Sequence, residues 1–343
     1  MPIQSNREDG HILKWDNAKG MLAVLVVLGH VAESALGRSP ELKWLFLFLY
    51  LFHMPAFFFL SGVVSKKAVA ARRYDRVVGF LLLHFLMKMI VFSVRFLLGE
   101  RPPGFHVYWE DGIAWYAFAM AVFLLLSILL QDMKRSYILI GAILLACFAG
   151  YDDAVGDTLV LSRIIVFFPF FYCGLCLDGK RLNRFLQQKK VIILSAVLFA
   201  AVLLLVWRYS ESLYWLRTLV TGRNPFSKLK RYRTWGGALR GLYYIWTFLL
   251  ITAFLALIPV KNTFLSWIGK RSLPIYALQI SLIRLLNFNG FRDRFMDWSI
   301  FPTKLIPCVL LTALVVLICS WGPFNRFFRA VMNVRRDEKA KEK

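Results

Sequence analysis

The stretch DNAKGMLAVLVVLGH, residues 16–30, decides the fold, because it begins a long apolar segment that carries two ionisable side chains. Lys19 precedes His30 by eleven residues. At 100° per residue, eleven steps return to within about 20° of the starting direction, so both side chains share one helix face, about 16 Å apart along the axis. Ionisable residues inside a membrane span are costly and mark functional sites. The stretch therefore predicts a membrane helix with a functional polar face.

The whole chain has the composition of a helical membrane protein. Of its 343 residues, 59% are hydrophobic and 16% are aromatic, and the mean hydropathy is +0.58. A soluble domain would not need so much apolar surface, so we expect an all-α transmembrane helix bundle with about ten spans. The expected spans are centred near Leu25, Phe52, Leu86, Phe123, Ile143, Phe167, Leu198, Leu249, Leu282 and Leu314.

One integral membrane domain, residues 1–334, accounts for nearly all of the sequence, and residues 335–343 form a short charged tail. The polar N-terminus and the absence of an A-x-A-like site after the first apolar run argue against a cleavable signal peptide. The five cysteines all fall in apolar runs. They are expected to be small buried hydrophobic residues, and no metal site is predicted.

The formal net charge of +23 has two readings. A nucleic-acid binder would gather its basic residues on one soluble face, whereas here they flank the apolar runs, as the positive-inside rule requires. We therefore expect no nucleic-acid partner, cytoplasmic N- and C-termini, and insertion in the cell (inner) membrane. The stretch 208–240 breaks this pattern, because it is basic although the topology places it outside. Either the topology differs there, or the loop meets an anionic acceptor or lipid.

The second apolar run contains HMPAFFFLSG, residues 53–62. Pro55 has no N–H to donate to the carbonyl four residues earlier, so the helix is expected to kink there and to free a backbone acceptor. His53 lies beside the kink. One interpretation is a packed aromatic helix with one hydrogen-bonded histidine; the other is a distorted helix that shapes a polar cavity beside His30.

These motifs together resemble the membrane acyltransferase family 3. The spacing of Lys19 and His30 matches the family's Arg/Lys-x10-His pattern, and residues 53–62 are similar to its second motif. Arg73 and Arg76 look like the arginine pair that precedes the family's third helix. Residues 268–276, IGKRSLPIY, are similar to its late Gly-x-x-Ser-Leu-x-Ile-Tyr element, after which the family often has a histidine where this chain has Gln279. Residues 168–174 resemble a pattern of the branch of fucose O-acetylases and other surface-glycan O-acetyltransferases.

The resemblance implies ten core helices and the transfer of an acyl group, usually acetyl, from cytoplasmic acyl-CoA (acetyl-CoA). The acceptor it implies is a hydroxyl of a cell-surface glycan or of its lipid-linked precursor. It also implies that Arg73 and Arg76 bind CoA phosphates, as their charge allows. Positive-inside anchoring alone would also place bases at these two positions.

The residues suggest a mechanism as well. A sugar hydroxyl is a poor nucleophile, so transfer needs a base, and an imidazole suits this because its ordinary pKa of about 6.5 lies near neutral pH. His30 could deprotonate the acceptor for direct attack on the thioester, or it could carry the acyl group as a covalent intermediate. Asp16 and Lys19 lie one turn apart and could form a snorkelling pair, or Lys19 could face the CoA phosphates or the thioester.

Ser272, Tyr276 and Gln279 repeat at helical spacing in the ninth span and form one polar stripe. The stripe could be a hydrogen-bonded helix seam or a wall of the acceptor cavity, to which His53 and Ser61 would also belong. Arg163, Arg284, Trp115 and Tyr116 are further candidates, and His84 is expected in the core. A multi-span transporter or flippase of a glycan or small anionic solute is the alternative function, although such proteins more often show repeated halves.

Overall fold

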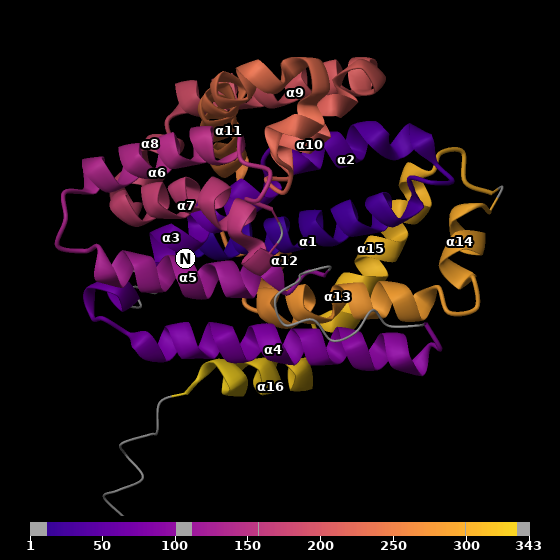
Figure 1. Cartoon of the computed structure of the whole chain (residues 1–343). Helices are drawn as coiled ribbons and strands as arrows, with labels where there is room; N and C mark the ends of the chain where they lie inside the picture. Colours follow the sequence, from indigo (N-terminus) through magenta and orange to yellow (C-terminus); the bar gives the residue numbers. More distant parts are fainter. Residues whose placement is uncertain (1–11, 101–111, 157, 299, 335–343) are drawn as a thin grey trace, which may run out of the picture.

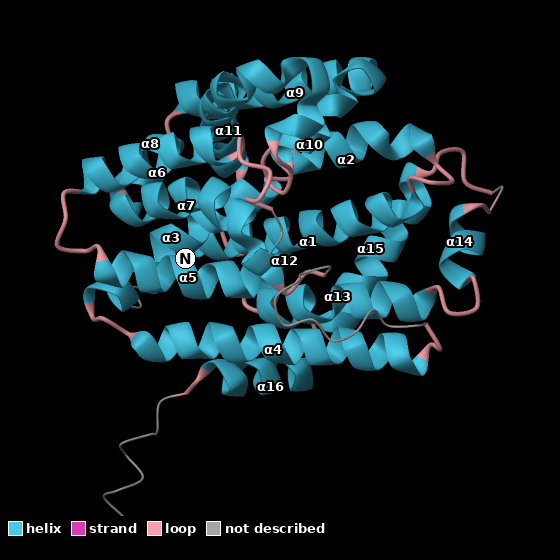
Figure 2. Cartoon of the chain, in the orientation of Figure 1, coloured by secondary structure: helices cyan, strands magenta, loops and turns pink. Residues whose placement is uncertain are grey.

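The computed structural model describes residues 12–100, 112–156, 158–298 and 300–334. Within these ranges every regular element is a helix and no strand occurs (Figure 2). The charged tail 335–343 lies outside the described residues, as does His106, which the sequence predicts in an outer loop. The α-helices are α1 (Leu13–Ala35), α2 (Lys43–Tyr50), α3 (His53–Ala70), α4 (Tyr74–Leu97), α5 (Trp115–Leu129), α6 (Arg135–Ala149), α7 (Leu161–Cys176), α8 (Gly179–Leu186), α9 (Lys189–Leu213), α10 (Arg217–Val220), α11 (Gly236–Leu257), α12 (Phe264–Gly269), α13 (Ser272–Leu286), α14 (Phe291–Met296), α15 (Leu305–Cys319) and α16 (Gly322–Met332).

The all-α membrane fold is confirmed, whereas the expected count of ten spans is not. Six helical segments of the described chain are long and apolar enough to cross a membrane, or seven if α15 and α16, bent by 64°, are counted together. Helices α5, α6 and α13 are apolar but have only 15 residues each. At 1.5 Å per residue such a helix is about 22 Å long, which is shorter than a hydrocarbon core of about 30 Å.

Helices α1 and α3 lie inside the bundle, while α4 and α9 lie on opposite flanks (Figure 1). The apolar window of the α2–α3 segment is 72% buried, but that of α9 is only 17% buried. The exposed residues of α9 are large and apolar, such as Leu194 and Leu204. A surface of this kind is stable against lipid rather than water, which fits an integral membrane protein.

Two helix pairs pack through glycines at backbone contact distance. A Cβ atom added to Gly62 in α3 would lie 2.0 Å from the carbonyl oxygen of Phe171, and one added to Gly174 in α7 would lie 2.0 Å from that of Phe59. Gly20 of α1 and Gly269 of α12 approach each other's backbones in the same reciprocal way. Small residues that allow close backbone approach are how membrane helices associate. Gly20 in the first motif therefore serves packing.

The expected disruption at Pro55 is confirmed. Helix α2 ends at Tyr50 and α3 begins at His53, so the helix is interrupted just before the proline. The carbonyl of Leu51, four residues before Pro55, has lost its helical donor and accepts a hydrogen bond of 3.4 Å from the Thr247 hydroxyl of α11. The break places His53 and Tyr50 beside the C-terminal half of α1.

Asn17 fixes the beginning of α1 to the segment between α11 and α12. Its side-chain nitrogen donates to the carbonyl oxygens of Pro259 and Lys261, both at 2.8 Å, and its oxygen accepts from the Thr263 hydroxyl at 2.8 Å. The side chain is fully buried. Its buried polar atoms thus find partners that hold α12 against α1, next to Lys19.

Candidate active site

Cavities lie beside both ionisable residues of the first motif, Lys19 and His30. His30 lines a cavity of about 570 Å³, and Lys19 lines a separate cavity of about 550 Å³. Tyr276 of α13 lines both. Lys19 and His30, which the sequence predicts on one helix face, thus line two neighbouring compartments with Tyr276 in the wall of both.

His30 lies against a carboxylate of its own helix. Its Nδ1 is 3.7 Å from Oε2 of Glu33, one turn further along α1, and 22% of its side chain is exposed. Glu33 is itself held in place, because Oε2 accepts a 2.8 Å hydrogen bond from the Tyr50 hydroxyl and Oε1 lies 3.3 Å from Nη2 of Arg217. The imidazole thus faces the cavity beside a fixed negative charge, neither sealed in dry packing nor turned to lipid.

Glu33 and Tyr50 were not predicted from the sequence, and Arg217 was predicted only as part of the basic stretch 208–240. A signal for Glu33 was present, because an acidic residue three positions after a histidine on one apolar helix lies on the same face. Tyr50 and Arg217 had no such signal. They reach Glu33 from α2 and α10, and only the packing of distant segments brings them there.

His53 is buried and lines the same cavity as His30. Its Nδ1 lies 2.6 Å from the carbonyl oxygen of Leu49, so Nδ1 carries the proton and donates. The Tyr50 ring packs edge-on against the imidazole, with centroids 4.7 Å apart. Both earlier interpretations therefore apply, since His53 is a hydrogen-bonded core histidine and also part of the cavity wall.

The cavity at Lys19 is lined by cationic and hydroxyl groups. Lys19 Nζ is 3.7 Å from Asp16 Oδ1, and both side chains line the cavity. Lys270 and Arg329 line it too, and Nη2 of Arg329 lies 3.4 Å from the Lys270 carbonyl oxygen. The amphipathic helix α16, which follows the bend after α15, thus supplies one wall of this compartment.

Hydroxyl groups and aromatic rings form the boundary between the compartments. The Ser61 and Tyr116 hydroxyls are 2.8 Å apart, and both residues line the Lys19 cavity. The rings of Tyr116 and Tyr276 pack edge-on with centroids 5.1 Å apart. Trp115 lines the His30 cavity, and the Arg163 guanidinium carbon lies 4.8 Å from the Trp115 ring centroid. An acyl chain passing between the two compartments would meet this wall of rings.

The polar stripe of Ser272, Tyr276 and Gln279 lies on α13, and its residues differ in their surroundings. Ser272 and Tyr276 line the Lys19 cavity. Gln279 is fully buried and lines neither the Lys19 cavity nor the His30 cavity. His84 is a core residue, as expected, and its Nδ1 is 3.0 Å from the Ala114 carbonyl oxygen.

Arg73 and Arg76 do not line any of these cavities. Arg73 precedes α4 and makes two hydrogen bonds to the Asp75 carboxylate, of 3.2 and 2.5 Å, which raise the pKa of its guanidinium above the ordinary value. Gly79, one turn after Arg76, packs against the backbone of Met332 at the end of α16. The arginine pair and Arg329 thus lie at the same end of the bundle.

The basic stretch 208–240 forms part of the His30 cavity. Its residues Arg217, Thr218, Thr221, Arg223 and Asn224 all line that cavity. Ring contacts hold Arg217 in place, because its guanidinium lies 5.1 Å from the Phe46 ring centroid and 5.9 Å from that of Tyr214. This stretch therefore closes over the end of α1 that carries His30.

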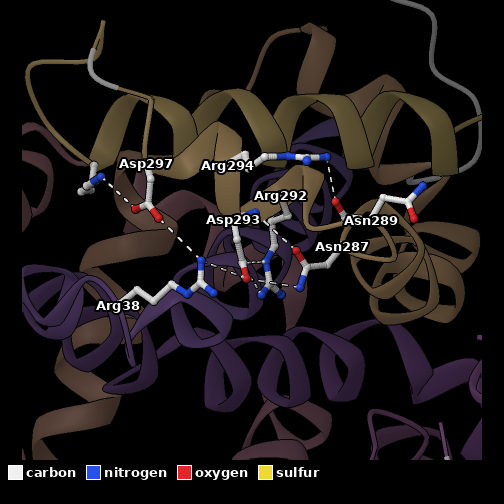
Figure 3. A network of polar contacts seen from close by, with 8 residues as sticks. Arg38, Asn287, Asn289, Arg292, Asp293, Arg294 and Asp297 are labelled. Atoms are coloured by element: carbon white, nitrogen blue, oxygen red, sulfur yellow. Dashed lines mark hydrogen bonds and ion pairs between the residues drawn. The ribbon is translucent and has the colours of Figure 1, made fainter.

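A third cavity, of about 480 Å³, adjoins the first and shares His30 and Arg284 with it. Two residues that line it, Asn287 and Arg292, belong to the network of polar contacts in Figure 3. In this network Arg38, which follows α1, lies 3.4 Å from Asp293 and 3.6 Å from Asp297. Burial alone would raise the pKa of the Asp293 carboxyl. The hydrogen bond and positive charge of Arg292, together with the charge of Arg38, outweigh the effect of burial, so the pKa lies below its ordinary value. The network ties α14 to the end of α1.

Comparison with known proteins places this geometry in a family. The chain is 24% identical over 302 residues to the nodulation protein NolL of Sinorhizobium fredii, which covers 82% of this chain and 80% of the relative. It is 23% identical over 347 residues to the nodulation protein NolL of Mesorhizobium japonicum, with 92% and 87% coverage. No solved structure matches. Residues 12–324 match the family model described as an acyltransferase domain, so the protein is a membrane acyltransferase of the acyltransferase-3 family.

Proposed function

We propose that the protein transfers an acetyl or other acyl group from cytoplasmic acyl-CoA to a hydroxyl of a cell-surface glycan or its lipid-linked precursor. The observation that carries the proposal is the pair of cavities that share Tyr276. One contains a histidine beside a carboxylate, which suits hydroxyl activation, and the other contains cations that suit the phosphates of CoA. Membership of an acyltransferase family and similarity to two nodulation proteins support a group-transfer reaction.

His30 is the proposed general base. The imidazole accepts the proton of the acceptor hydroxyl while the hydroxyl oxygen attacks the thioester carbonyl carbon, and the resulting imidazolium is stabilised by Glu33, 3.7 Å away. Collapse of the tetrahedral adduct breaks the carbon–sulfur bond. The proton then passes from His30 to the departing CoA sulfur, so the products are the ester and free CoA. General base assistance of this kind contributes about 10²–10⁴-fold to the rate.

Glu33 orients His30 in this scheme. Since Nδ1 faces the carboxylate, Nε2 is the nitrogen left to take the proton. Tyr50 and Arg217 in turn hold the carboxylate from two sides. An acyl-His30 intermediate remains the competing route, in which the imidazole attacks the thioester first and the acceptor hydroxyl attacks the acyl-imidazole second.

The donor is proposed to bind at the opposite end of α1. Lys19, Lys270 and Arg329 line the cavity there, and Arg73 and Arg76 lie at the same end of the bundle. Their positive charges complement the CoA phosphates. Cytoplasmic N- and C-termini, insertion in the inner membrane and the positive-inside rule would put this end in the cytoplasm, where acyl-CoA is found.

The test is turnover of labelled acetyl-CoA by the purified protein in lipid nanodiscs, followed by analysis of glycans from cells with and without the gene. Acyl transfer predicts CoA release that requires an acceptor, and a mass difference of one acetyl group on a glycan of the cells that carry the gene. A transporter would move its solute into sealed vesicles and release no CoA. Solute uptake by the protein in sealed vesicles, without any CoA release, would overturn the proposal.

A further inference from the structure

The His30 cavity is unusually rich in arginine. Five arginines from four helices and a loop line it, whereas Glu33 is the one carboxylate among its described lining residues. The five arginines are Arg95, Arg163, Arg217, Arg223 and Arg284. Catalysis by His30 and Glu33 explains none of them except Arg217, which holds Glu33.

The carboxylates beside Arg95, Arg217 and Arg284 engage only part of the hydrogen-bonding capacity of these three guanidinium groups. Arg95 and Arg284 approach the same oxygen of Glu100, at 3.3 and 2.9 Å. Arg217 uses one Nη for Glu33, and its flat face lies over aromatic rings. A guanidinium has five N–H donors in one plane, so a ring on its face and one carboxylate contact leave further donors in that plane.

Several guanidinium groups at one cavity in a membrane protein are costly to maintain unless an anion offsets them. Phosphate groups suit this arrangement better than carboxylates, because a phosphate or diphosphate offers three or more oxygens to guanidinium groups that converge from different directions. Neutral polar side chains also line the cavity: the Thr221 hydroxyl donates to the Arg217 carbonyl oxygen at 3.0 Å and accepts from the Asn224 amide at 3.3 Å, which holds both side chains beside Arg217.

We infer that this cavity binds a phosphate or diphosphate group carried by the acyl acceptor, with Arg217 and Arg284 as the principal contacts. The inference rests on the proposed function in one respect, namely that the occupant of the cavity is the acceptor. It narrows the acceptor to a phosphorylated glycan or a sugar linked to lipid through phosphate. Binding of the anion beside His30 would hold the acceptor while its hydroxyl reaches the imidazole.

The experiment measures pyrophosphate binding by isothermal titration calorimetry, with the full chain in nanodiscs of neutral phosphatidylcholine. Saturating CoA fills any donor phosphate site. The variants are Arg217→Gln and Arg284→Gln, on different helices, and the matched control is Arg233→Gln, an exposed arginine of the same basic stretch that lines none of the described cavities. A charge-assisted hydrogen bond contributes about 1.5–3 kcal/mol, so each cavity variant should raise the Kd for pyrophosphate about tenfold or more. Arg233→Gln should leave it unchanged.

Three results would overturn the inference. The first is unchanged binding in both cavity variants that keep the wild-type thermal midpoint. The second is an affinity for glucuronate equal to that for pyrophosphate, which would show that the cavity does not prefer phosphate over a carboxylate. The third is loss of pyrophosphate binding by the wild-type protein in nanodiscs that contain phosphatidylglycerol, which would assign the site to a lipid headgroup. Failure of the proposed function has a different signature, since CoA itself would then give no binding isotherm while the pyrophosphate result stands.

Discussion

His30 and Glu33 form a histidine–carboxylate pair on one helix, with Nδ1 of the imidazole 3.7 Å from Oε2 of the carboxylate. The distance is that of an ion pair and is longer than a hydrogen bond. A small side-chain rotation would close it, as happens in active sites that tighten when substrate binds. In the proposed mechanism, Glu33 stabilises the protonated form of this partly exposed histidine where it is made.

Replacing His30 by alanine should abolish transfer while leaving the fold intact. The imidazole is partly exposed to a cavity, so its removal costs little packing, whereas loss of the base should slow acyl transfer by about 10²–10⁴-fold or more. Acceptor-dependent CoA release is the measurement. The matched control is His84→Gln, a core histidine away from the cavities, which should retain transfer per folded molecule. Wild-type rates in His30→Ala would remove the general base from the mechanism.

Replacing Glu33 by glutamine should lower kcat more than it raises KM. The amide keeps the size of the side chain but loses the charge that stabilises the imidazolium, so kcat should fall about 10–100-fold. Tyr50→Phe removes one hydrogen bond to the carboxylate and should give a smaller change in the same direction. A wild-type kcat in Glu33→Gln would leave Glu33 a purely structural role.

Donor affinity should depend on the cations at the Lys19 end of α1. Lys270→Ala with Arg329→Ala, and separately Arg73→Ala with Arg76→Ala, should each raise the KM for acyl-CoA more than the KM for the acceptor, because CoA phosphates lose charged partners. Steady-state kinetics with each substrate varied in turn is the measurement. Arg184→Ala, an exposed basic residue of α8, is the control and should leave both constants unchanged. If only one pair raises the donor KM, the phosphates bind at that pair.

Helix packing at the paired glycines should tolerate no added methyl group. In Gly62→Ala or Gly174→Ala the new Cβ would lie 2.0 Å from a backbone oxygen, so α3 and α7 must separate. The expected loss of stability is about 1–3 kcal/mol, seen as a lower thermal midpoint in detergent or nanodiscs. Gly141→Ala in α6, where nothing lies within 4 Å of the new atom, is the matched control. It should raise stability by about 0.4–1 kcal/mol, and equal losses at all three sites would contradict the packing argument.

The network around α14 should weaken in acid. The pKa of Asp293 is lower in the folded protein than its ordinary value, so the carboxylate stabilises the fold above the unfolded pKa of about 3.9 and loses this effect as the pH falls through the folded pKa. Thermal midpoints from pH 7 to pH 3 should therefore fall less steeply in Asp293→Asn than in wild type. Parallel curves for the two proteins would show that this carboxylate does not contribute.

Some parts of the fold and site follow from local sequence. Pro55 lacks an N–H, so a break before it is a local necessity, and the structure shows the break together with the freed Leu51 carbonyl. The long apolar runs of the chain likewise predict a bundle of membrane helices. The number of spans could not be predicted equally well from the sequence. Helices α5, α6 and α13 are apolar but short, and composition does not fix where a helix ends.

The sequence by itself determined that Lys19 and His30 share a helix face, because the direction of a side chain on one helix depends only on its number. It also determined the membrane class and the family resemblance. Only the tertiary structure decided that the two residues face separate compartments divided at Tyr276, and that Tyr50 and Arg217 hold Glu33 beside His30. The physical reason is that such contacts join segments up to hundreds of residues apart. They depend on close approaches such as that of Gly20 and Gly269, which no local pattern specifies.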